Sequence, residues 1–554
     1  MRDLAENRNP AVKTMTINGK TVSFSPGETI LEVARKSGIY IPTLCARADL
    51  PSTGACRLCI VKVEGIRGHV TSCTTPATPN MIVTTNSDEI EKLRRGVLEL
   101  ILSEHPSACL VCPIKETCEL FNAPPSKTGR VTGCNMCSNR DMCELRQLVE
   151  YLGLQEIRYP FFYKGFPLER DDPFMDRDYN LCILCGRCIR SCEEKLGVSA
   201  ISFIRRGHDT KVGTSFDKLH VDGNCVFCMH CVDVCPTGAL SVKGSKWYGY
   251  SDNETPTTCI LCEQGCELVI DAKWHKVVGV HPVRDMSTGK REYCVKGRCC
   301  LPALFNNPDR LKYPAIRRDE GKMIYTDWDS AIQHVSRVLF HYRPNEIAIL
   351  SSSHLTDESV YTLNEFARIY AESNIFYIAD DDIIFPHIEK PDEIFKDIKI
   401  LYLAEANSLT DEILDKFGRL ENIIIQDIYP SPVSKLPKTC AILPAAVFTE
   451  MNGTKSCADN CRKPVTKAAE PPGDAIPDWE ITVAIGKALQ SPDFTIKDFR
   501  SIQRHIQMHP WTIVSIPMVP RDALTYRGFS ISDYVPDFKT LVEHRLTSKG
   551  EVHF

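Results

Sequence analysis

The residues with the clearest chemical potential in this sequence are its cysteines. It has 27 of them, and 24 lie between Cys45 and Cys300, leaving Cys440, Cys457 and Cys461 in the remainder. Many are two or three residues apart, which is typical of sites that hold metals or iron–sulfur clusters. A disulfide framework is typical of short secreted chains, whereas this chain has 554 residues and shows no secretory signal. We therefore expect metal clusters in a reducing compartment, the cytoplasm.

The first group of cysteines has the layout of a plant-type ferredoxin with a widened first gap. Its spacing is Cys-x10-Cys-x2-Cys-x13-Cys, and four such thiolates are typical ligands of a [2Fe-2S] cluster. A structural zinc site is the alternative. The residues around it predict a small β-grasp-like frame, with a hairpin over 15–24 that turns at Asn18-Gly19 and a helix over 28–35. The expected ligands are Cys45, Cys56, Cys59 and Cys73.

The second group combines one histidine with three cysteines and follows a helix predicted over 93–103. His105, Cys109, Cys112 and Cys118 form a complete ligand set. A neutral imidazole in place of a thiolate removes one negative charge from the site, which should raise the potential of a bound cluster.

The cysteines of this second group are repeated 25 residues later as Cys134, Cys137 and Cys143. The copy has Arg130 where the first has His105, so it offers three thiolates and needs a fourth ligand from elsewhere. A zinc ion, a further cluster and three idle thiols are the alternatives for this site.

The most specific signal is a pair of Cys-x2-Cys-x2-Cys-x3-Cys runs. This is the pattern of bacterial ferredoxins with two [4Fe-4S] clusters, in which the fourth cysteine of each run ligates the other cluster. Cys235 should therefore complete the first site and Cys192 the second. Glu193 stands where the first run would usually have proline, which affects a turn and not a ligand. The runs are Cys182, Cys185, Cys188 and Cys192, followed by Cys225, Cys228, Cys231 and Cys235.

A last group reads Cys259-x2-Cys262-x3-Cys266, with Cys294 after a gap of 27 residues. Residues 269–280 alternate enough to predict strands beneath this site. Since four well-spaced cysteines already make a site, we expect Cys299 and Cys300 to be structural thiols.

Beyond about residue 308, apolar strands alternate with helical segments, which predicts a parallel, layered α/β sheet. The sequence contains neither Gly-x-Gly-x-x-Gly nor a phosphate-binding Gly-Lys-Ser/Thr loop. We expect an irregular, proline-rich surface segment over 463–477. The predicted strands are 347–350, 375–378, 398–403 and 423–425, and the predicted helices are 358–370 and 411–420.

Charge and hydropathy exclude two classes of partner. The formal net charge is −5, so no basic surface for nucleic acid is expected. The mean hydropathy is −0.18, and no apolar run approaches the ~18 residues of a membrane span, so direct membrane insertion is not expected either.

These motifs carry a family resemblance. Residues 15–143 resemble the N-terminal part of the large iron–sulfur subunit of respiratory NADH dehydrogenase (complex I), which is shared with multimeric iron-only hydrogenases and NAD-dependent formate dehydrogenases. Residues 180–240 resemble the two-cluster insert of the formate dehydrogenases and hydrogenases. Residues 259–298 resemble the [4Fe-4S] segment of molybdopterin oxidoreductases, where Lys296 would lie between cluster and pterin, and 452–454 and 472–479 resemble later segments of that superfamily.

The sequence also departs from the molybdopterin enzymes. It has 254 residues after Cys300 and no cysteine from 301 to 439, where the family places a metal-binding cysteine or selenocysteine. The resemblance therefore implies one [2Fe-2S] cluster, four [4Fe-4S] clusters and no molybdopterin. Cys457 and Cys461 stand where relatives have no thiol pair, and we expect them to be structural.

The expected fold is multidomain, α+β and α/β. It comprises a plant-type [2Fe-2S] ferredoxin-like β-grasp domain (14–95), a domain with the His/Cys-ligated cluster and the duplicated motif (96–150), a bacterial two-[4Fe-4S] ferredoxin domain (151–250), a molybdopterin-oxidoreductase-like [4Fe-4S] domain (251–312) and a shortened α/β domain (313–554).

The expected function is electron transfer within a multisubunit NAD(P)-linked oxidoreductase, without a catalytic site in this chain. Clusters move single electrons, and hydride oxidation needs a two-electron centre elsewhere. The resemblance implies a flavoprotein partner with NAD(P)H and FMN or FAD, a small [2Fe-2S] subunit, and soluble ferredoxin in an electron-bifurcating complex. The alternatives are a small molybdenum or tungsten formate dehydrogenase, an iron-only hydrogenase and a zinc-stabilised scaffold.

Overall fold

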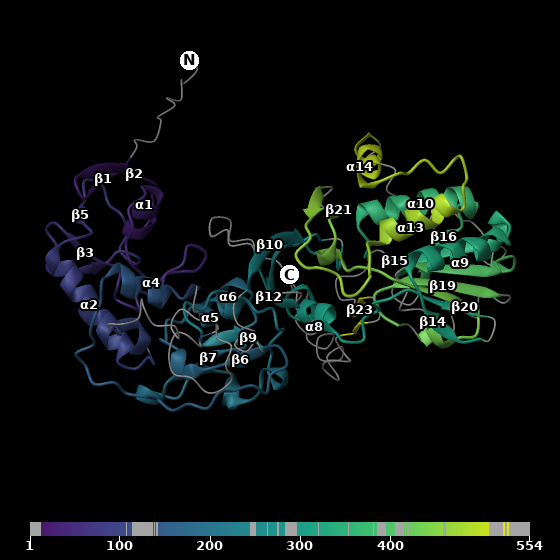
Figure 1. Ribbon diagram of the computed structural model, residues 1–554. Coiled ribbons are helices and arrows are strands. Elements are labelled where there is room, and N and C mark those ends of the chain that lie inside the picture. The colour runs from purple at the N-terminus through teal and green to yellow at the C-terminus, as the bar shows by residue number, and fades with distance from the viewer. Residues whose placement is uncertain are drawn as a thin grey trace, which may run out of the picture. The chain divides into compact units, whose positions relative to one another are not determined.

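Two structural units carry the cysteine groups and the α/β layers in the computed structural model, one formed mainly by residues up to Tyr250 and one by residues from Ser251 (Figure 1). The structure describes residues 13–106, 108–112, 137, 139, 142–243, 251–262, 264–273, 276–282, 296–318, 321–352, 354–379, 382–384, 395–404, 415, 417, 420–430, 432–457, 461–508, 525–526 and 529–530.

The first unit begins with a five-stranded sheet in the order β2-β1-β5-β3-β4. Strands β1 and β2 form the predicted hairpin, whose turn places Asn18 and Gly19 at φ 50° and 78°. Glycine and asparagine tolerate this left-handed backbone, which explains the turn. The strands are β1 (Lys13–Ile17), β2 (Lys20–Phe24), β3 (Ile60–Val63), β4 (Val70–Thr71) and β5 (Ile82–Thr84).

Helix α1 (Ile30–Lys36) packs against this sheet. It begins two residues later than predicted because Thr29 caps it: the Thr29 side chain accepts from the Glu32 amide, and the Glu32 carboxylate accepts from the Thr29 amide. Ile30, Leu31 and Val33 are buried with Met15 of β1 in a core that also contains two of the predicted ligands, Cys59 and Cys73.

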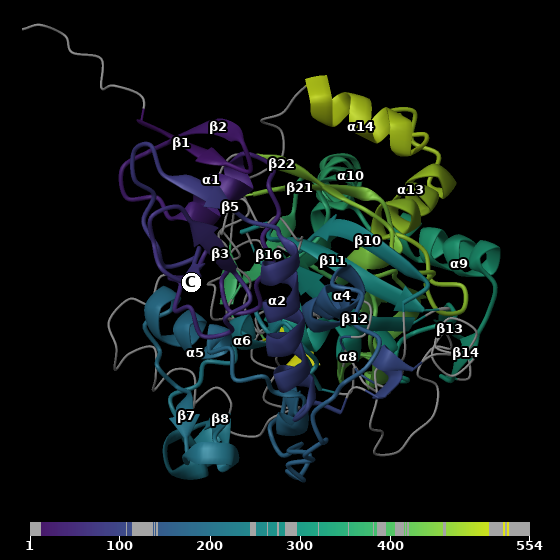
Figure 2. The same cartoon turned by 90° about the vertical axis from the view of Figure 1, so that its left-hand side faces the viewer.

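Helix α2 (Asp88–Leu102) starts five residues before the predicted helix because Ser87 provides its N-cap. Its Leu98 and Leu102 share a core with Leu145 and Leu148 of α4 (Glu144–Tyr151). Figure 2 shows α2 and α4 of this unit.

The rest of the first unit consists of short elements around the ferredoxin cysteines. Two antiparallel pairs, β6 with β9 and β7 with β8, accompany two single-turn helices. The elements are β6 (Met175–Arg177), α5 (Arg187–Arg190), β7 (Ser202–Ile204), β8 (Lys211–Gly213), α6 (His230–Asp233) and β9 (Leu240–Val242).

The second unit opens with an antiparallel sheet of β10 (Asn253–Thr258), β11 (Glu267–Lys273) and β12 (Lys276–Pro282). These strands confirm the prediction over 269–280. Leu268 and Ile270 on one face of β11 enter the core, and Val269 and Lys273 on its other face are buried as well. Helix α8 (Leu301–Asn306) follows a π-helical turn at Lys296–Cys300.

The α/β layer is an eight-stranded sheet in the order β14-β13-β20-β19-β18-β15-β16-β17. Its centre is parallel, which confirms the α/β prediction, whereas β13, β14 and β17 pair antiparallel at the edges. The strands are β13 (Ala315–Arg317), β14 (Met323–Tyr325), β15 (Ile347–Ser352), β16 (Ile375–Ala379), β17 (Asp382–Ile384), β18 (Ile400–Ala404), β19 (Asn422–Asp427) and β20 (Thr439–Pro444).

Helices cover one face of this sheet, where α9, α10 and α13 are drawn in Figure 1. Their apolar side chains join Ile349, Tyr402 and Ile424 in one core, and Leu350, Leu401 and Ile425 belong to a separate core on the other face. The helices are α9 (Trp328–Phe340), α10 (Asp357–Tyr370), α13 (Asp478–Ala488) and α14 (Phe499–Met508). Most of the helix predicted over 411–420 lies outside the described residues.

The prediction of an irregular segment over 463–477 is wrong for its first three residues, which belong to a strand. Strand β22 (Arg462–Val465) pairs with β21 (Gly453–Ser456), and Pro464 lies opposite Thr454. A two-stranded ribbon tolerates proline because its outer edge needs no amide donor. A further short hairpin joins β23 (Thr525–Tyr526) to β24 (Phe529–Ser530). Among the helices that the structure describes, none is both long and apolar enough to cross a membrane.

The core beneath the first cysteine group gives a stability prediction. Leu31→Ala should lower the local free energy of opening by about 2–5 kcal/mol, because Leu31 is 1% exposed and its removal leaves a cavity. Hydrogen exchange of the amides in 13–36 measures this. Leu100→Ala is the control, since Leu100 is 53% exposed and should change little. Equal protection in both variants would contradict the packing described here.

Candidate metal centres

The first cysteine group converges on loops of the five-stranded sheet. Cys59 Sγ lies 3.3 Å from Cys73 Sγ, and the Cys56 amide donates to Cys45 Sγ at 3.4 Å. Hydrogen bonding with Cys56 lowers the pKa of Cys45, while hydrogen bonding with Cys45 raises the pKa of Cys73. The four cysteines are thus linked to one another by short contacts, and backbone amides that point at sulfur are what a bound cluster requires.

His105 has the environment of a ligand. Its imidazole is buried, and among the described residues neither ring nitrogen has a hydrogen-bond partner. Burial lowers the pKa of His105 to about 4, which keeps the ring neutral and able to bind a metal. Cys109 lies in the short 3-10 helix Ala108–Val111 and Cys112 directly follows it. Cys118 lies outside the described residues.

The duplicated motif packs against the ferredoxin cysteines. The Glu144 amide donates to the Pro236 carbonyl at 3.0 Å, and the Asn139 side chain donates to the Thr237 carbonyl at 3.1 Å. Burial, followed by the neighbouring Cys137 and Cys235, raises the pKa of Cys143 to about 12. Cys134 lies outside the described residues, so the choice between zinc, a cluster and idle thiols stays open.

The first ferredoxin site contains a cysteine from the second run. A pocket is lined by Cys182, Cys185, Cys188 and Cys235. Burial and then Cys235 raise the pKa of Cys185 to about 12. The four sulfurs predicted to share one cluster therefore face a common cavity.

The second ferredoxin site is related to the first by similar backbone geometry. Burial and the charge of Cys192 raise the pKa of Cys228 to about 12, so Cys192 lies near the second run. The amides of Leu184 and Phe227 donate to Cys182 and Cys225, the first sulfur of each run, at 3.4 and 3.3 Å. Both donors have left-handed backbone, with φ 53° and 52°.

Two buried arginines join the cysteine groups of the first unit. Arg190 Nη2 donates to the carbonyls of Cys45, at 2.6 Å, and Cys185, at 3.3 Å. Arg187 pairs with both carboxylate oxygens of Glu144, at 2.6 and 2.7 Å. One side chain thus contacts the backbone of the first group and of the ferredoxin run, and another ties that run to the duplicated motif. Neither contact could be foreseen from cysteine spacing.

The last cysteine group lies between β10 and β11. The Cys259 amide donates to the Cys266 carbonyl at 2.8 Å, which closes the loop that carries Cys262. A Cβ at Gly297 would lie 3.4 Å from Cys259 Sγ, so the π-helical turn approaches this sulfur. Cys294 and the Lys296 side chain lie outside the described parts of the structure.

The remaining cysteines differ in environment. Cys440 is buried in β20 and its thiol donates to the Ile423 carbonyl. Cys299 is half-buried and Cys461 exposed, and the Cys300 side chain is outside the described residues. Cys457 is buried, with its sulfur against Gly265 next to Cys266; Gly265 has φ +57° and leaves no room for a side chain there. No pattern in the sequence indicated that Cys457 returns to this loop.

Four family descriptions match separate stretches of the chain. Residues 12–88 match "2Fe-2S iron-sulfur cluster binding domain", and 94–123 match "NADH-ubiquinone oxidoreductase-G iron-sulfur binding region". Residues 172–241 match "NADH-quinone oxidoreductase subunit 3, ferredoxin-like domain". Residues 310–384 and 385–488 match "Molybdopterin oxidoreductase".

Similar curated proteins are subunits of oxidoreductases. NADPH-Fe(3+) oxidoreductase subunit alpha of Geobacter sulfurreducens is 30% identical over 64% of this chain and 39% of its own length. NADP-reducing hydrogenase subunit HndD of Solidesulfovibrio fructosivorans is 38% identical over 42% of this chain and 37% of its own length. The mitochondrial NADH-ubiquinone oxidoreductase 78 kDa subunit of Neurospora crassa is 26% identical over 67% of this chain and 46% of its own length.

The matches thus span less than half of each of these three relatives. They confirm the resemblance carried by the cysteine motifs: the chain contains iron–sulfur domains of the NADH-ubiquinone oxidoreductase-G type and a molybdopterin-oxidoreductase domain, and its relatives are subunits of NAD(P)-linked oxidoreductases.

Proposed function

We propose that this chain is the iron–sulfur electron-transfer subunit of a multisubunit NAD(P)-linked oxidoreductase. Clusters bound by its cysteine groups would carry electrons one at a time. The observation that carries the proposal is the contact of Arg190 with the carbonyls of both Cys45 and Cys185. Two ligand groups that share one buried side chain are held at a fixed and short separation, which electron transfer between them needs.

We assign the ligands by the groups described above. Cys45, Cys56, Cys59 and Cys73 would hold a [2Fe-2S] cluster. His105, Cys109, Cys112 and Cys118 would hold a [4Fe-4S] cluster, as would Cys259, Cys262, Cys266 and Cys294. Cys182, Cys185, Cys188 and Cys235 would hold another, and Cys192, Cys225, Cys228 and Cys231 the last.

The chain's own residues would influence the reduction potentials of the bound clusters. The amides that donate to Cys45, Cys182 and Cys225 stabilise negative charge on sulfur. Arg190 adds a positive charge beside two ligand groups and so favours the reduced state of each.

The partners follow from chemistry that this sequence lacks. Hydride transfer needs a two-electron centre, and no glycine-rich nucleotide loop occurs in the sequence. We therefore propose a flavoprotein subunit that binds NAD(P)H and FMN or FAD, together with a small [2Fe-2S] subunit. Soluble ferredoxin would be a further partner if the complex bifurcates electrons.

Purification tests this proposal. The tagged chain, isolated anaerobically from its own cells, should retain a flavoprotein. Addition of NAD(P)H should then reduce the clusters of that complex and bleach its visible absorption. The chain purified alone should keep its absorption when NAD(P)H is added. Bleaching of the isolated chain by NAD(P)H, or a colourless protein, would refute the proposed role.

The second candidate is a molybdenum or tungsten enzyme, which the match of 310–488 to molybdopterin oxidoreductases favours. We propose instead that this domain holds no pterin and serves in assembly, because the sequence has no cysteine between 301 and 439 to bind the metal.

Metal analysis separates the two candidates. The anaerobically purified chain should contain roughly 18 iron atoms, from one [2Fe-2S] and four [4Fe-4S] clusters, and no stoichiometric molybdenum or tungsten. Fewer than about 12 iron atoms in freshly prepared protein would contradict the cluster assignment. Stoichiometric molybdenum or tungsten would establish the enzyme instead.

The crossed ligands give a further prediction. Cys192→Ala should perturb the cluster of Cys225, Cys228 and Cys231 and leave that of its sequence neighbours Cys182, Cys185 and Cys188 intact. Electron paramagnetic resonance of the reduced protein would show the loss of one [4Fe-4S] signal.

Cys440→Ala is the matched control, because Cys440 is a buried cysteine whose thiol donates to a backbone carbonyl. All cluster signals should persist in this variant. Loss of the Cys182 signal alone in Cys192→Ala would reverse the assignment.

A further inference from the structure

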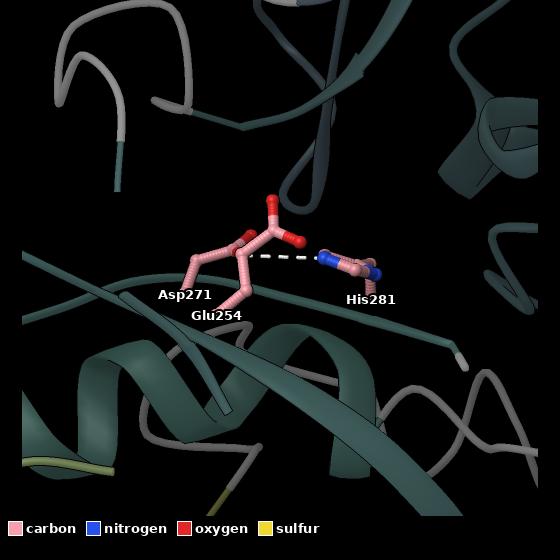
Figure 3. A group of neighbouring side chains, drawn as sticks. All are labelled: Glu254, Asp271 and His281. Atoms are coloured by element: carbon pink, nitrogen blue, oxygen red, sulfur yellow. Dashed lines mark ion pairs between the residues drawn. The ribbon is translucent and has the colours of Figure 1, made fainter. Parts of the chain in front are cut away.

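Three potential metal ligands meet on the sheet of β10, β11 and β12: Glu254, Asp271 and His281 (Figure 3). Their nearest ligand atoms all lie within 4.8 Å of one another. We propose that these residues bind a divalent transition-metal ion, with zinc as the reference ion. The site is separate from the cysteine groups and does not depend on the proposed electron-transfer role.

Strand register brings the three side chains to one face. Glu254 of β10 lies directly opposite Asp271 of β11, and Asp271 lies opposite Gly279 of β12. His281 is two residues beyond Gly279 and therefore points to the same face. That face is opposite the one on which Leu268 and Ile270 enter the core.

The geometry suits an ion between the strands. His281 Nε2 lies 3.2 Å from Asp271 Oδ1. Two ligands about 2.0–2.1 Å from a tetrahedral zinc ion are about 3.3 Å apart, so this pair already has the required spacing. The Glu254 side chain is exposed and can rotate to supply the third ligand, and solvent can supply the fourth.

Glu254 and Asp271 place two carboxylates directly opposite each other across neighbouring strands, and such like charges repel. Asp271 Oδ1 is shielded from solvent, and apart from the 3.2 Å approach of His281 Nε2 it accepts no hydrogen bond from the residues that the structure describes. A bound cation would satisfy this oxygen and offset the repulsion.

Gly279 lies opposite Asp271 and leaves room for its carboxylate. A Cβ there would lie 2.7 Å from Asp271 Oδ2, closer than side-chain atoms can approach. The absence of a side chain lets the Asp271 carboxylate lie across β12, beside His281. The bulge after Asp271 lies at the same place in the ladder.

The ligand types favour zinc among common ions. Imidazole is a poor ligand for magnesium and calcium, whereas zinc accepts both imidazole and carboxylate. An ion held by one residue from each strand would fasten the three-stranded sheet that carries Cys259 and Cys266 at its other end.

Equilibrium dialysis against micromolar ZnCl2 tests the site in the full chain with its clusters loaded. The wild-type protein should bind one more zinc ion than Asp271→Asn or His281→Gln. Glu267→Gln is the matched control, because Glu267 is an exposed residue at the other end of β11, and it should bind zinc as the wild type does. Iron content should be equal in all four proteins.

X-ray absorption at the zinc edge identifies the ligands. We expect nitrogen and oxygen at about 2.0–2.1 Å, whereas zinc in a vacant cysteine site would show sulfur at about 2.3 Å. Gly279→Ala keeps every ligand but displaces Asp271, and should weaken zinc binding at least tenfold. Equal zinc binding by wild type and Asp271→Asn, or sulfur as the neighbour of the extra zinc, would overturn the proposal.

Discussion

Thiolate sulfurs repel one another, and a chain that gathers four of them must supply the compensating interactions itself or through a bound cation. In this protein the backbone supplies part of that compensation. Amides of Cys56, Leu184 and Phe227 donate to sulfur, and the last two belong to residues with left-handed backbone that lie two positions after their cysteine acceptors. The short loops, single-turn helices and tight cores around the cysteines follow from this requirement.

The same requirement explains why charged side chains are buried among the cysteine groups. Arg187 and Arg190 are almost wholly buried, a costly position for a guanidinium unless it is paired. Arg187 meets Glu144 in a two-point contact, and the terminal nitrogen Nη2 of Arg190 donates to backbone carbonyls, while the Nε atoms of both arginines have no hydrogen-bond partner among the described residues. Both also lie beside groups that would be negatively charged when clusters are bound. These arginines thereby contact separate cysteine groups within one unit.

The second unit combines a cysteine-bearing sheet with an α/β layer. The hairpin of β21 and β22 connects them: Thr258 donates to the Pro464 carbonyl at 2.7 Å, and Lys463 donates to the Gly265 carbonyl at 3.0 Å. The loop from Cys259 to Cys266 is therefore supported by residues some 200 positions later in the chain. This dependence gives a molybdopterin-type domain a structural reason to be present even if it binds no pterin.

Local sequence determined much of this protein. The Asn18-Gly19 turn, the central parallel strands and the cysteine spacings each act over a few residues, so short-range steric and hydrogen-bonding rules were enough to predict them. The contacts that decide how the groups meet were not predictable in this way. Arg190 reaches Cys45 across 145 positions, Cys457 returns to Gly265, and Glu254, Asp271 and His281 meet only through strand register. Such contacts depend on which segments pack together, because spacing along the chain fixes the ligands within a loop but not which loop lies beside it.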